Sequence, residues 1–535
     1  MTASRWFFLL VLLFWLTSGV AQSNRYIVFF KDKTNTPFTT NEPQKFLSPK
    51  SIERRGNQQI LVVDEDLPAN PAYVSGVKGL GAKTFFTSRW MNCLLIEADI
   101  ALITSIQSLP YVLKVELVAP GAMLTGGRTK RWKNKNETSE ESMTTSQLEQ
   151  IGLDEMQLEG YRGESKTIAV FDSGFPGVNA AAPFQGLYQE GRVKFTYNFV
   201  ANNTNVYQYD DHGTEVLSVI AAEAQGFTGG AYKADFMLFV TEDFTSEYRI
   251  EEFNWLFAAE KADSAGVDII NASVGYNLFD DVSMNYKTSD LDGKTAIVTQ
   301  AAVKAISKGM IVLCSAGNEG NNSWQLVTPP ADAPGILAIG SITQQFSKSS
   351  FSSIGPSSDG RVKPDVVALG SGTAVVKPNG MISSNSGTSF SSPLVASLVA
   401  GIWQAYPELS AKEVYEAIIK SANQFMNPDN QKGYGLPHFS AVRNYLESKD
   451  LEEWITLHPN PVTGDTITIT LKDPQGDFLD VIIYDVQGRI LTESQLVITW
   501  QNNPFEYAFS GLSPGIYFIK VKSPSDSKVV RVVKL

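Results

Sequence analysis

Three short polar segments of the sequence carry residue types that can together perform nucleophilic catalysis. Asp172 begins an Asp-Ser-Gly segment, His212 begins a His-Gly-Thr segment, and Ser389 lies within Gly-Thr-Ser-Phe-Ser-Ser-Pro. A serine hydroxyl is a weak nucleophile at neutral pH, so it needs an imidazole that accepts its proton and later returns it to the leaving group. A carboxylate beside the imidazole holds the required tautomer. We therefore predict that these residues form a catalytic triad.

His212 and Asn318 are the best candidates for the base and for the donor to a developing oxyanion. The other two histidines, His438 and His458, lie beside prolines near the end of the catalytic segment and in the linker to the tail. Asn318 follows a Ser-Ala-Gly segment, so its side-chain amide and the backbone N–H of Ser389 could bind the oxygen of a tetrahedral intermediate. The alternative is that Asn318 only stabilises a turn.

The predicted strands end at these polar segments. The apolar run 167–171 ends at Asp172, the run 267–270 ends at Asn-Ala-Ser-Val-Gly, and the run 310–313 ends at Cys-Ser-Ala-Gly-Asn. Sites in open α/β sheets form at the carboxyl ends of the strands, so we expect these groups at one edge. A further strand is expected at 336–339, and amphipathic helices are expected at 215–224, 251–265, 296–308 and 412–421. Residues 140–447 are thus predicted to form an open parallel sheet with helices on both faces.

Over roughly residues 145–440, these motifs resemble the signatures of the subtilisin-like (subtilase, S8) family of serine peptidases. The resemblance implies a subtilisin-like fold and a serine endopeptidase that cleaves peptide bonds through an acyl-enzyme. It assigns the oxyanion role to Asn318 and implies no cofactor and no metal in the chemistry. A lipase-type hydrolase is disfavoured, because residues 387–391 do not form the Gly-x-Ser-x-Gly motif.

The resemblance also suggests how a protein or peptide substrate is held. Ser273, Val274 and Gly275 resemble the strand that pairs with the substrate backbone, where small residues allow close approach. Ser315, Ala316 and Gly317 resemble the opposite wall of the pocket for the residue before the scissile bond. Pro330 corresponds to a family proline near the pocket floor, for which a cis peptide bond is one alternative.

Two features leave finer details open. Glu215 stands where the family commonly has a second histidine, which weakens a subgroup assignment but leaves the triad intact. Acidic pairs could bind structural calcium, although such pairs are more often solvated loops. These pairs are Asp210 with Asp211, Asp280 with Asp281, and Asp290 with Asp292.

The chain begins with features of an exported precursor. Residues 1–21 contain Arg5, an apolar run too short to span a bilayer, and small residues before position 22, which predicts a secretory signal peptide and no transmembrane span in the mature form. Residues 22–133 hold strand runs at 26–30, 93–96 and 112–118 and a helix near 100–109, with a polar stretch after them. They resemble a small α+β subtilase propeptide with its processing linker, which would inhibit the enzyme. A permanent partner-binding domain is the alternative.

The tail, residues 457–535, shows short strands separated by turn residues and is predicted to be a small all-β sandwich. The strands are expected at 466–471, 481–484, 505–509, 516–521 and 529–533. The stretches LHPNPVTGDTITI, VIIYDVQGRIL, LSPGIYFIKV and VVRVVKL resemble the C-terminal sorting domain of the type IX secretion system. This resemblance implies outer-membrane secretion machinery as a partner and a secreted or surface location in a Gram-negative bacterium. An ordinary carbohydrate-binding or spacer sandwich is the alternative.

Composition excludes some partners and suggests one contact. The 535 residues carry a net charge of -12, which gives no general surface for nucleic acid or anionic membranes. Residues 22–133 have 15 basic and 9 acidic side chains, whereas 134–535 have 28 and 47. This favours docking of a basic propeptide on an acidic body, unless the difference is chance variation. Because Cys93 and Cys314 lie in different segments, stability should come from apolar cores.

The first hypothesis is therefore a secreted serine endopeptidase. The runner-up is a surface-bound pseudo-enzyme or adhesin that keeps the fold for binding, against which the complete triad and Asn318 argue. The sequence does not indicate the cleavage preference.

Overall fold

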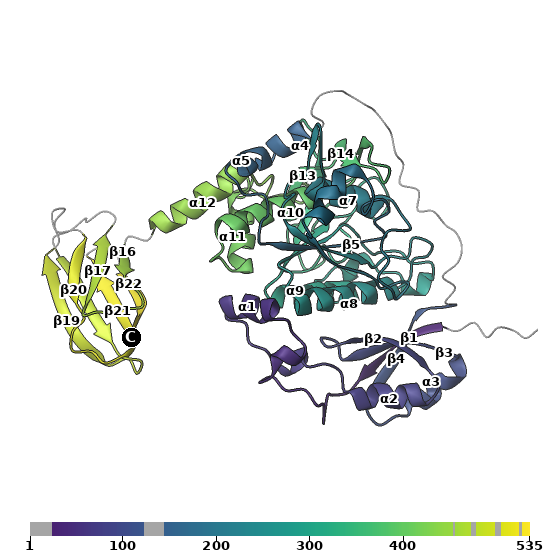
Figure 1. Ribbon diagram of the computed structural model, residues 1–535, viewed down its shortest axis with the longest axis horizontal. Helices are drawn as coiled ribbons and strands as arrows, with labels where there is room; N and C mark the ends of the chain where they lie inside the picture. The colour runs from purple at the N-terminus through teal and green to yellow at the C-terminus, as the bar shows by residue number, and fades with distance from the viewer. Residues whose placement is uncertain (1–23, 122–143, 453–454, 472–477, 498–503, 524–526) are drawn as a thin grey trace, which may run out of the picture. The chain divides into compact units, whose positions relative to one another are not determined.

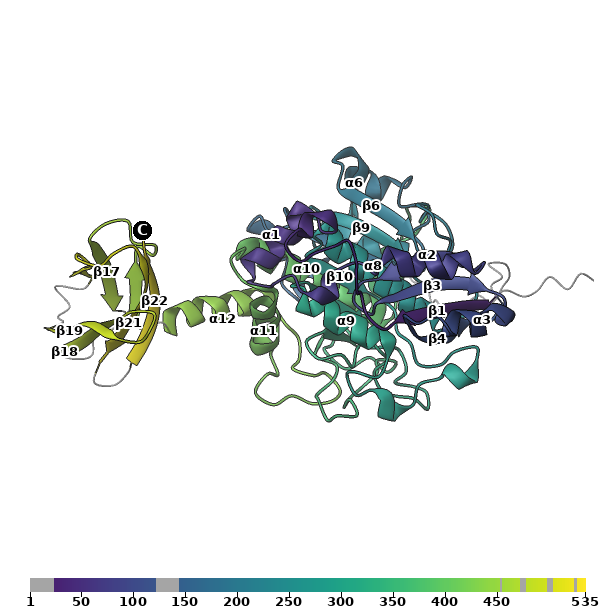
Figure 2. The same ribbon diagram turned by 90° about the horizontal axis from the view of Figure 1, so that it is seen from below.

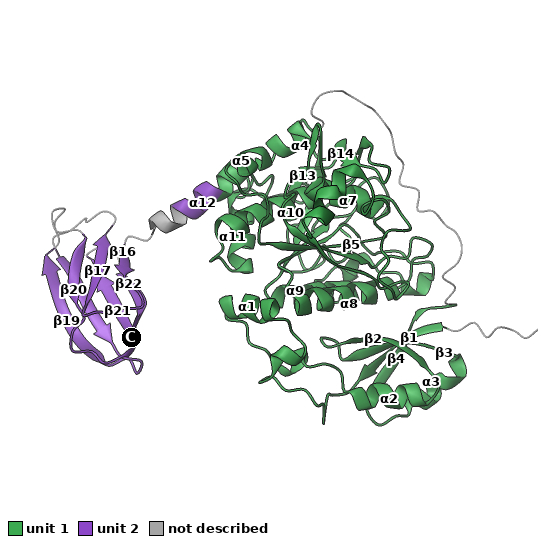
Figure 3. Ribbon diagram, in the orientation of Figure 1, with its two compact units in different colours: residues 1–442 green, residues 443–535 purple. Residues whose placement is uncertain are grey.

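The computed structural model describes residues 24–121, 144–452, 455–471, 478–497, 504–523 and 527–535. The predicted signal peptide at 1–21 and most of the predicted processing linker lie outside the described residues. The chain divides into two compact units, residues 1–442 and 443–535 (Figure 3). The first unit contains both the propeptide segment and the catalytic body.

A parallel sheet of seven strands forms the centre of the catalytic body. Apart from the edge strand β6, the strands are largely apolar and buried on both faces, as expected for a sheet that helices cover on each side. In sheet order they are β13 (Val366–Leu369), β12 (Leu337–Ile342), β11 (Ile311–Ser315), β10 (Ile269–Ala272), β5 (Thr167–Asp172), β9 (Asp235–Val240) and β6 (Val193–Asn198). The expected fold class is therefore confirmed, and β6, β9 and β13 are strands that the sequence analysis missed.

Helices cover both faces of this sheet (Figure 1). On one face lie α7 (His212–Ala221) and α10 (Thr388–Ala405), and on the other lie α8 (Ile250–Ala265) and α9 (Ile297–Ser307). Further helices and one hairpin complete the main elements. The short helices are α4 (Thr145–Glu149), α5 (Leu153–Leu158) and α6 (Gln185–Gln189), and the longer ones are α11 (Ala411–Ser421) and α12 (Phe439–Glu452). The hairpin consists of β14 (Thr373–Val376) and β15 (Ile382–Asn385).

The propeptide segment is an α+β fold whose antiparallel sheet is buried on both faces. Its strands are β1 (Asn24–Phe30), β2 (Lys83–Ser88), β3 (Cys93–Ala98) and β4 (Val112–Ala119), in the order β2-β3-β1-β4. Side chains alternate along a strand, so Tyr26 and Val28 pack in a core near α2 (Pro71–Gly79) and α3 (Ile100–Gln107). Ile27 and Phe29 face the other way and join the core of the catalytic body. This explains why the run YIVFF is apolar without interruption.

The propeptide sheet packs on α8 and α9 (Figures 1 and 2). Phe29 contacts Phe253 edge to face at 6.2 Å between ring centroids, and Phe86 packs against Phe257 at 5.4 Å. The two parts thus share one apolar core, which is why they form a single compact unit.

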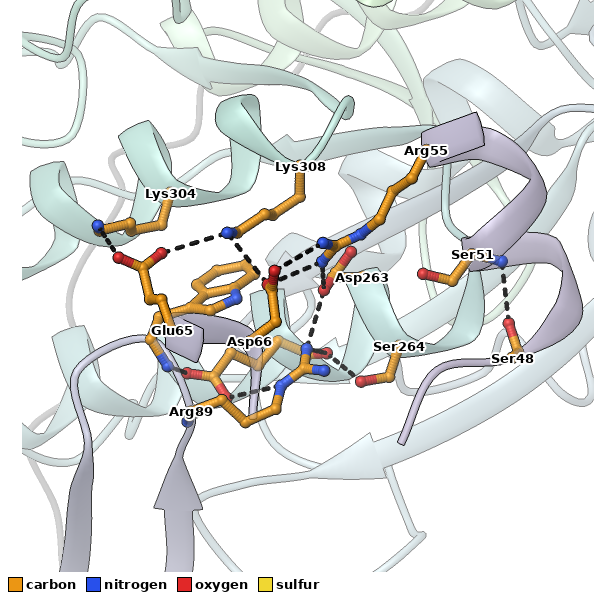
Figure 4. A network of polar contacts seen from close by, with 12 residues as sticks. Ser48, Ser51, Arg55, Glu65, Asp66, Arg89, Asp263, Ser264, Lys304 and Lys308 are labelled. Carbon is orange, nitrogen blue, oxygen red and sulfur yellow. Dashed lines mark hydrogen bonds and ion pairs between the residues drawn. The ribbon is translucent and has the colours of Figure 1, made fainter. Parts of the chain in front are cut away.

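A second contact comes from helix α1 (Pro49–Asn57), which the sequence analysis missed. Ser48 caps this helix by accepting a hydrogen bond from Ser51 N–H, and Pro49 occupies its first turn (Figure 4). The buried face of α1 contains arginines instead of an apolar stripe, so no hydrophobic periodicity marks it. The Nζ of Lys50 donates to the Oγ1 of Thr167 at 2.6 Å, at the amino end of β5.

Asp263 of α8 accepts hydrogen bonds from three propeptide guanidinium groups. Arg54 lies 2.6 Å from one carboxylate oxygen. Arg55 and Arg89 lie 2.7 and 2.9 Å from the other (Figure 4). Glu260 of the same helix accepts from the backbone N–H of Arg89 at 2.8 Å. Asp263 is fully buried, so this group of charges is removed from water.

In a second set of ion pairs, lysines of the catalytic body contact acidic residues of the propeptide. Lys304 of α9 and Lys308, which directly follows this helix, both pair with Glu65 of the propeptide (Figure 4). Lys308 also lies 3.0 Å from Asp66. The expectation of a basic segment on an acidic body therefore describes only part of the contact, because each side contributes both signs of charge.

The tail is a sandwich of two antiparallel sheets. One sheet contains β16 (Ile455–His458), β17 (Thr466–Leu471) and β20 (Phe505–Ala508), and the other contains β18 (Phe478–Tyr484), β19 (Ile490–Val497), β21 (Gly515–Lys522) and β22 (Ser527–Lys534). Ile467, Val481 and Ile519 lie in the core between the sheets. The predicted all-β tail is confirmed, with β16 and β19 as additional strands.

Cys93 and Cys314 are both buried and both free, in agreement with stabilisation by apolar cores. Across the described ranges, no helix has the length and apolarity needed to cross a membrane.

Replacing Asp263 with asparagine should destabilise the first unit by about 3 kcal/mol, because buried guanidinium groups then lose the carboxylate that they share. Urea unfolding of the full chain, followed through the fluorescence of the core residues Trp90 and Trp255, measures this loss.

Glu42→Gln is the matched control. Glu42 pairs with Lys45 at 2.7 Å on the surface, and such pairs contribute at most about 1 kcal/mol. Equal losses in the two variants would contradict a specific role for the buried network.

Candidate active site

The carboxyl edge of the central sheet holds a cavity of about 190 Å³. Asp172 ends β5, Ser273 follows β10, and Ser315 ends β11, so three neighbouring parallel strands deliver residues to it. His212 and Ser389, which lie at the starts of α7 and α10, also line this cavity. The structure thus brings together the three residues predicted to form the triad.

His212 is bound to Asp172 through its inner ring nitrogen. The Nδ1–H of His212 donates to the carboxylate of Asp172, with distances of 2.9 and 3.1 Å to the two oxygens. Asp172 is fully buried and also accepts from the backbone N–H of Ser173 at 2.8 Å. A Cβ at Gly213 would lie 2.3 Å from the carbonyl oxygen of Gly174 and 2.9 Å from the Cβ of Asp172. Glycine at position 213 therefore permits the close approach of α7 to β5.

The surroundings of His212 favour its charged form. Burial by itself would lower the pKa, but the charge of Asp172 and its hydrogen bond, together with the charges of Asp210 and Glu215, raise the pKa of His212 to about 9. Since the ordinary pKa is about 6.5, the charged imidazole contributes stability that is complete below that pH and is lost as the pH rises through 9.

Ser389 lies in the first turn of α10, just after Gly387. Its hydroxyl donates to the carbonyl of Ser273 at 3.3 Å, and its own carbonyl accepts from the hydroxyl of Ser273 at 2.9 Å. These bonds join the start of α10 to the segment after β10. The partial positive charge at the helix start favours negative charge close to Ser389.

Asn318 is oriented by Thr388. Its Oδ1 accepts from the backbone N–H of Thr388 at 2.9 Å and from the hydroxyl at 3.0 Å. Since the carbonyl end of the amide is held in this way, the Nδ2 end remains for another acceptor. Asn318 lines the same cavity as Ser389, which fits the predicted oxyanion donor.

Five of the six predicted substrate-binding residues line the cavity: Ser273, Val274, Gly275, Ser315 and Gly317. Ala316 is fully buried and is not among the lining residues. Its backbone N–H donates to Ile339 in β12, and its carbonyl accepts from the backbone N–H of Thr328. Ala316 therefore supports the wall from behind.

The cavity also contains residues that the sequence analysis missed, namely Ser173, Asp210, Glu242, Phe244, Glu319 and Thr328. Asp210 was considered only as a calcium ligand. Thr328 directly precedes Pro329 and Pro330, and the sequence analysis placed only Pro330 near the pocket floor. The Pro329–Pro330 peptide bond is cis. The two consecutive prolines could have indicated Thr328 as a pocket residue, because prolines restrict the backbone next to the pocket.

Glu215, the departure from the usual family pattern, is buried within α7. Its carboxylate pairs with Lys377, which follows β14, and accepts from the Nδ2 of Asn385 in β15 at 2.6 Å. Glu215 thus ties the histidine-bearing helix to the hairpin that precedes α10.

The acidic pairs considered as calcium ligands mostly accept local hydrogen bonds. Asp281 accepts from Ser283 N–H, Asp290 from Lys287 N–H, and Asp292 from two backbone N–H groups in its own turn. Within the described residues, no group of three or more His, Cys, Asp or Glu side chains is placed to hold a metal ion. Calcium binding stays a prediction.

The pKa of His212 predicts alkaline activity. Only the neutral imidazole can accept a proton, so kcat/KM should rise about tenfold per pH unit up to about pH 9 and then level off. Asp210→Asn removes a charge that raises this pKa, so the profile should shift to lower pH. Peptide hydrolysis by the processed protein across this range measures both effects.

Asp281→Asn, which neutralises a partly exposed carboxylate outside the cavity, is the control and should leave the profile in place. A profile that is flat between pH 7 and 9 would contradict the raised pKa of His212.

Three family models match successive parts of the chain. Residues 163–435 match the subtilase family of S8 peptidases, residues 25–139 match the peptidase S8 propeptide domain of Bacteroidota, and residues 456–535 match a secretion system C-terminal sorting domain. Such a sorting domain indicates a secreted or cell-surface protein.

Curated relatives agree with these matches. The chain is 30% identical over 285 residues to subtilisin NAT of Bacillus subtilis subsp. natto, a match that covers 52% of this chain and 66% of that protein. It is 29% identical over 300 residues to subtilisin of Bacillus pumilus, covering 55% of this chain and 97% of that one. The crystal structure of MycP1 from Mycobacterium smegmatis matches with a TM-score of 0.45 and 21% identity, covering 56% of this chain and 83% of that one.

The match to subtilisin NAT spans just under two thirds of that relative. The subtilase model, in contrast, covers half of this chain and includes the segments of Asp172, His212 and Ser389. This chain belongs to the subtilase family.

Proposed function

We propose that the protein is a secreted serine endopeptidase that cleaves protein or peptide substrates through an acyl-enzyme on Ser389. The observation that carries the proposal is the hydrogen bond of 2.9 Å between His212 Nδ1 and the buried carboxylate of Asp172, in a cavity that Ser389 and Asn318 also line. This bond fixes the ring so that Nε2 is the nitrogen available as base.

In the proposed reaction, His212 Nε2 takes the proton of the Ser389 hydroxyl as its oxygen attacks the substrate carbonyl. The Nδ2 of Asn318 and the backbone N–H of Ser389 stabilise the oxyanion. His212 then gives the proton to the leaving amine, and water hydrolyses the acyl-enzyme by the same steps. Asp172 stays ionised throughout and stabilises the imidazolium.

Residues 22–133 are proposed to act as the inhibitor of their own catalytic body. Support comes from the match to the S8 propeptide domain and from the core that the propeptide sheet shares with α8 and α9. A buried contact of this kind should persist after the linker is cut, so that inhibition ends only when the propeptide dissociates or is degraded.

Export is proposed to use the outer-membrane machinery that recognises the tail. The sorting-domain match over 456–535 supports this, together with the sandwich fold of the described tail. The enzyme would then act outside a Gram-negative cell, either released or attached to the surface.

Ser389→Ala should lower kcat/KM for casein-derived peptides at least about 1,000-fold, because the nucleophile is lost. Asn318→Ala should lower it about 100-fold or more, since removal of one oxyanion donor has that effect in subtilisin. Both are measured on the processed protein by release of peptide products.

Ser386→Ala is the matched control, because Ser386 is exposed and precedes α10. It should cleave at close to the wild-type rate. A Ser389→Ala variant that retains most of the activity would mean that another group is the nucleophile, and an inactive wild type would favour a binding protein.

A further inference from the structure

Thr328 lies between the two walls of the substrate pocket. A Cβ at Gly275, on one wall, would lie only 2.2 Å from the Oγ1 of Thr328. A Cβ at Gly317, on the other wall, would lie 3.0 Å from the same oxygen and 2.8 Å from the Oγ of Ser353. The hydroxyl of Thr328 thus occupies space next to both glycines, where the side chain of a substrate residue would enter between the walls.

The hydroxyl of Thr328 has no hydrogen-bond partner among the residues that the structure describes. Thr328 is 3% exposed and lines the cavity, so this polar atom is buried at its inner end. A buried hydroxyl without a partner is costly, which makes it a strong acceptor and donor for a ligand that reaches it.

The backbone holds Thr328 firmly in this place. Its N–H donates to the carbonyl of Ala316 at 3.2 Å, and the carbonyl of the following residue, Pro329, accepts from Tyr276 N–H at 2.9 Å. Both partners belong to the segments that form the walls. The backbone that carries this side chain is therefore a fixed part of the pocket, bonded to both walls.

Apart from His212, the charged side chains that line the cavity are acidic. Asp210, Glu242 and Glu319 line it in addition to Asp172, and no lysine or arginine is found among the described lining residues. An anionic substrate side chain would be repelled in this field.

We infer, on the basis of the proposed function, that Thr328 closes the pocket for the residue before the scissile bond and selects short, uncharged, hydrogen-bonding side chains there: Ser, Thr and Asn. The position of the Thr328 hydroxyl limits the length of the substrate side chain. Because this hydroxyl lacks a partner among the described residues, a side chain that can hydrogen-bond to it binds more favourably. The acidic side chains of the lining repel Asp and Glu. Large aromatic side chains are excluded because the hydroxyl occupies the space between Gly275 and Gly317.

The test compares kcat/KM of the processed protein for peptides that differ only in the residue before the scissile bond: Asn, Ser, Ala, Asp and Phe. The wild type should prefer Asn and Ser over Ala by about fivefold, the range of one net hydrogen bond. It should cleave Phe and Asp peptides at least about tenfold more slowly than Ala. Mapping of cleavage products from casein gives an independent view of the same preference.

Two substitutions separate the hydroxyl from the size of the side chain. Thr328→Val keeps the branched shape and removes the hydroxyl, so the preference for Asn over Ala should be lost. Thr328→Gly opens the pocket, so the Phe-to-Ala ratio should rise at least about tenfold. Thr343→Val, at a threonine outside the cavity, is the matched control and should leave all ratios unchanged.

The inference is overturned if the wild type prefers Phe to Ala, or if Thr328→Val keeps the preference for Asn over Ala. Labelling of Ser389 with a fluorophosphonate shows that each variant is folded and distinguishes the two failures. A wild type that labels but cleaves only after large residues contradicts the inference alone, whereas one that neither labels nor cleaves contradicts the proposed function as well.

Discussion

The hydrogen bond between His212 and the buried Asp172 is the constraint on which the rest of the catalytic body depends. The two residues belong to different elements, β5 and α7, which must meet at one edge of the sheet. Glycine at 213 lets the elements approach, and Glu215 holds α7 against the β14–β15 hairpin. The same packing brings α10 to the ends of β10 and β11, so that Ser389, Asn318 and the pocket walls surround one cavity.

A second physical feature is the charge that the body buries beneath its propeptide. Glu260 and Asp263 lie on a helix that packs against the sheet, and burial raises the pKa of Glu260 although Arg89 and neighbouring hydrogen bonds oppose the shift. In the unit described here, propeptide arginines compensate these carboxylates. Dissociation of the propeptide would expose them to water together with the apolar face of α8, which makes release costly.

Much of the central sheet and of the candidate site could be predicted from the sequence, because polar groups at strand ends and glycine-rich turns form recognisable patterns. The triad segments, Asn318 and five of the six wall residues were found by motif, and their convergence followed from the parallel sheet. Helix α1 could not be found, because its buried face contains Arg54 and Arg55, which both pair with Asp263, over 200 residues away. Thr328 was missed because its role arises only where two distant glycines meet it. A motif also does not indicate which residue of a wall faces the cavity, so the position of Ala316 behind the lining could not be predicted.

The most direct test of the account is the site and rate of reaction with a serine-directed fluorophosphonate, followed by mass spectrometry of the processed protein. We predict a single adduct, located on Ser389. Its rate of formation should increase with pH as His212 loses its proton, and it should fall sharply in His212→Ala. An adduct on a different serine, or a rate at Ser389 that does not depend on His212, would contradict the assignment of this cavity as the active site.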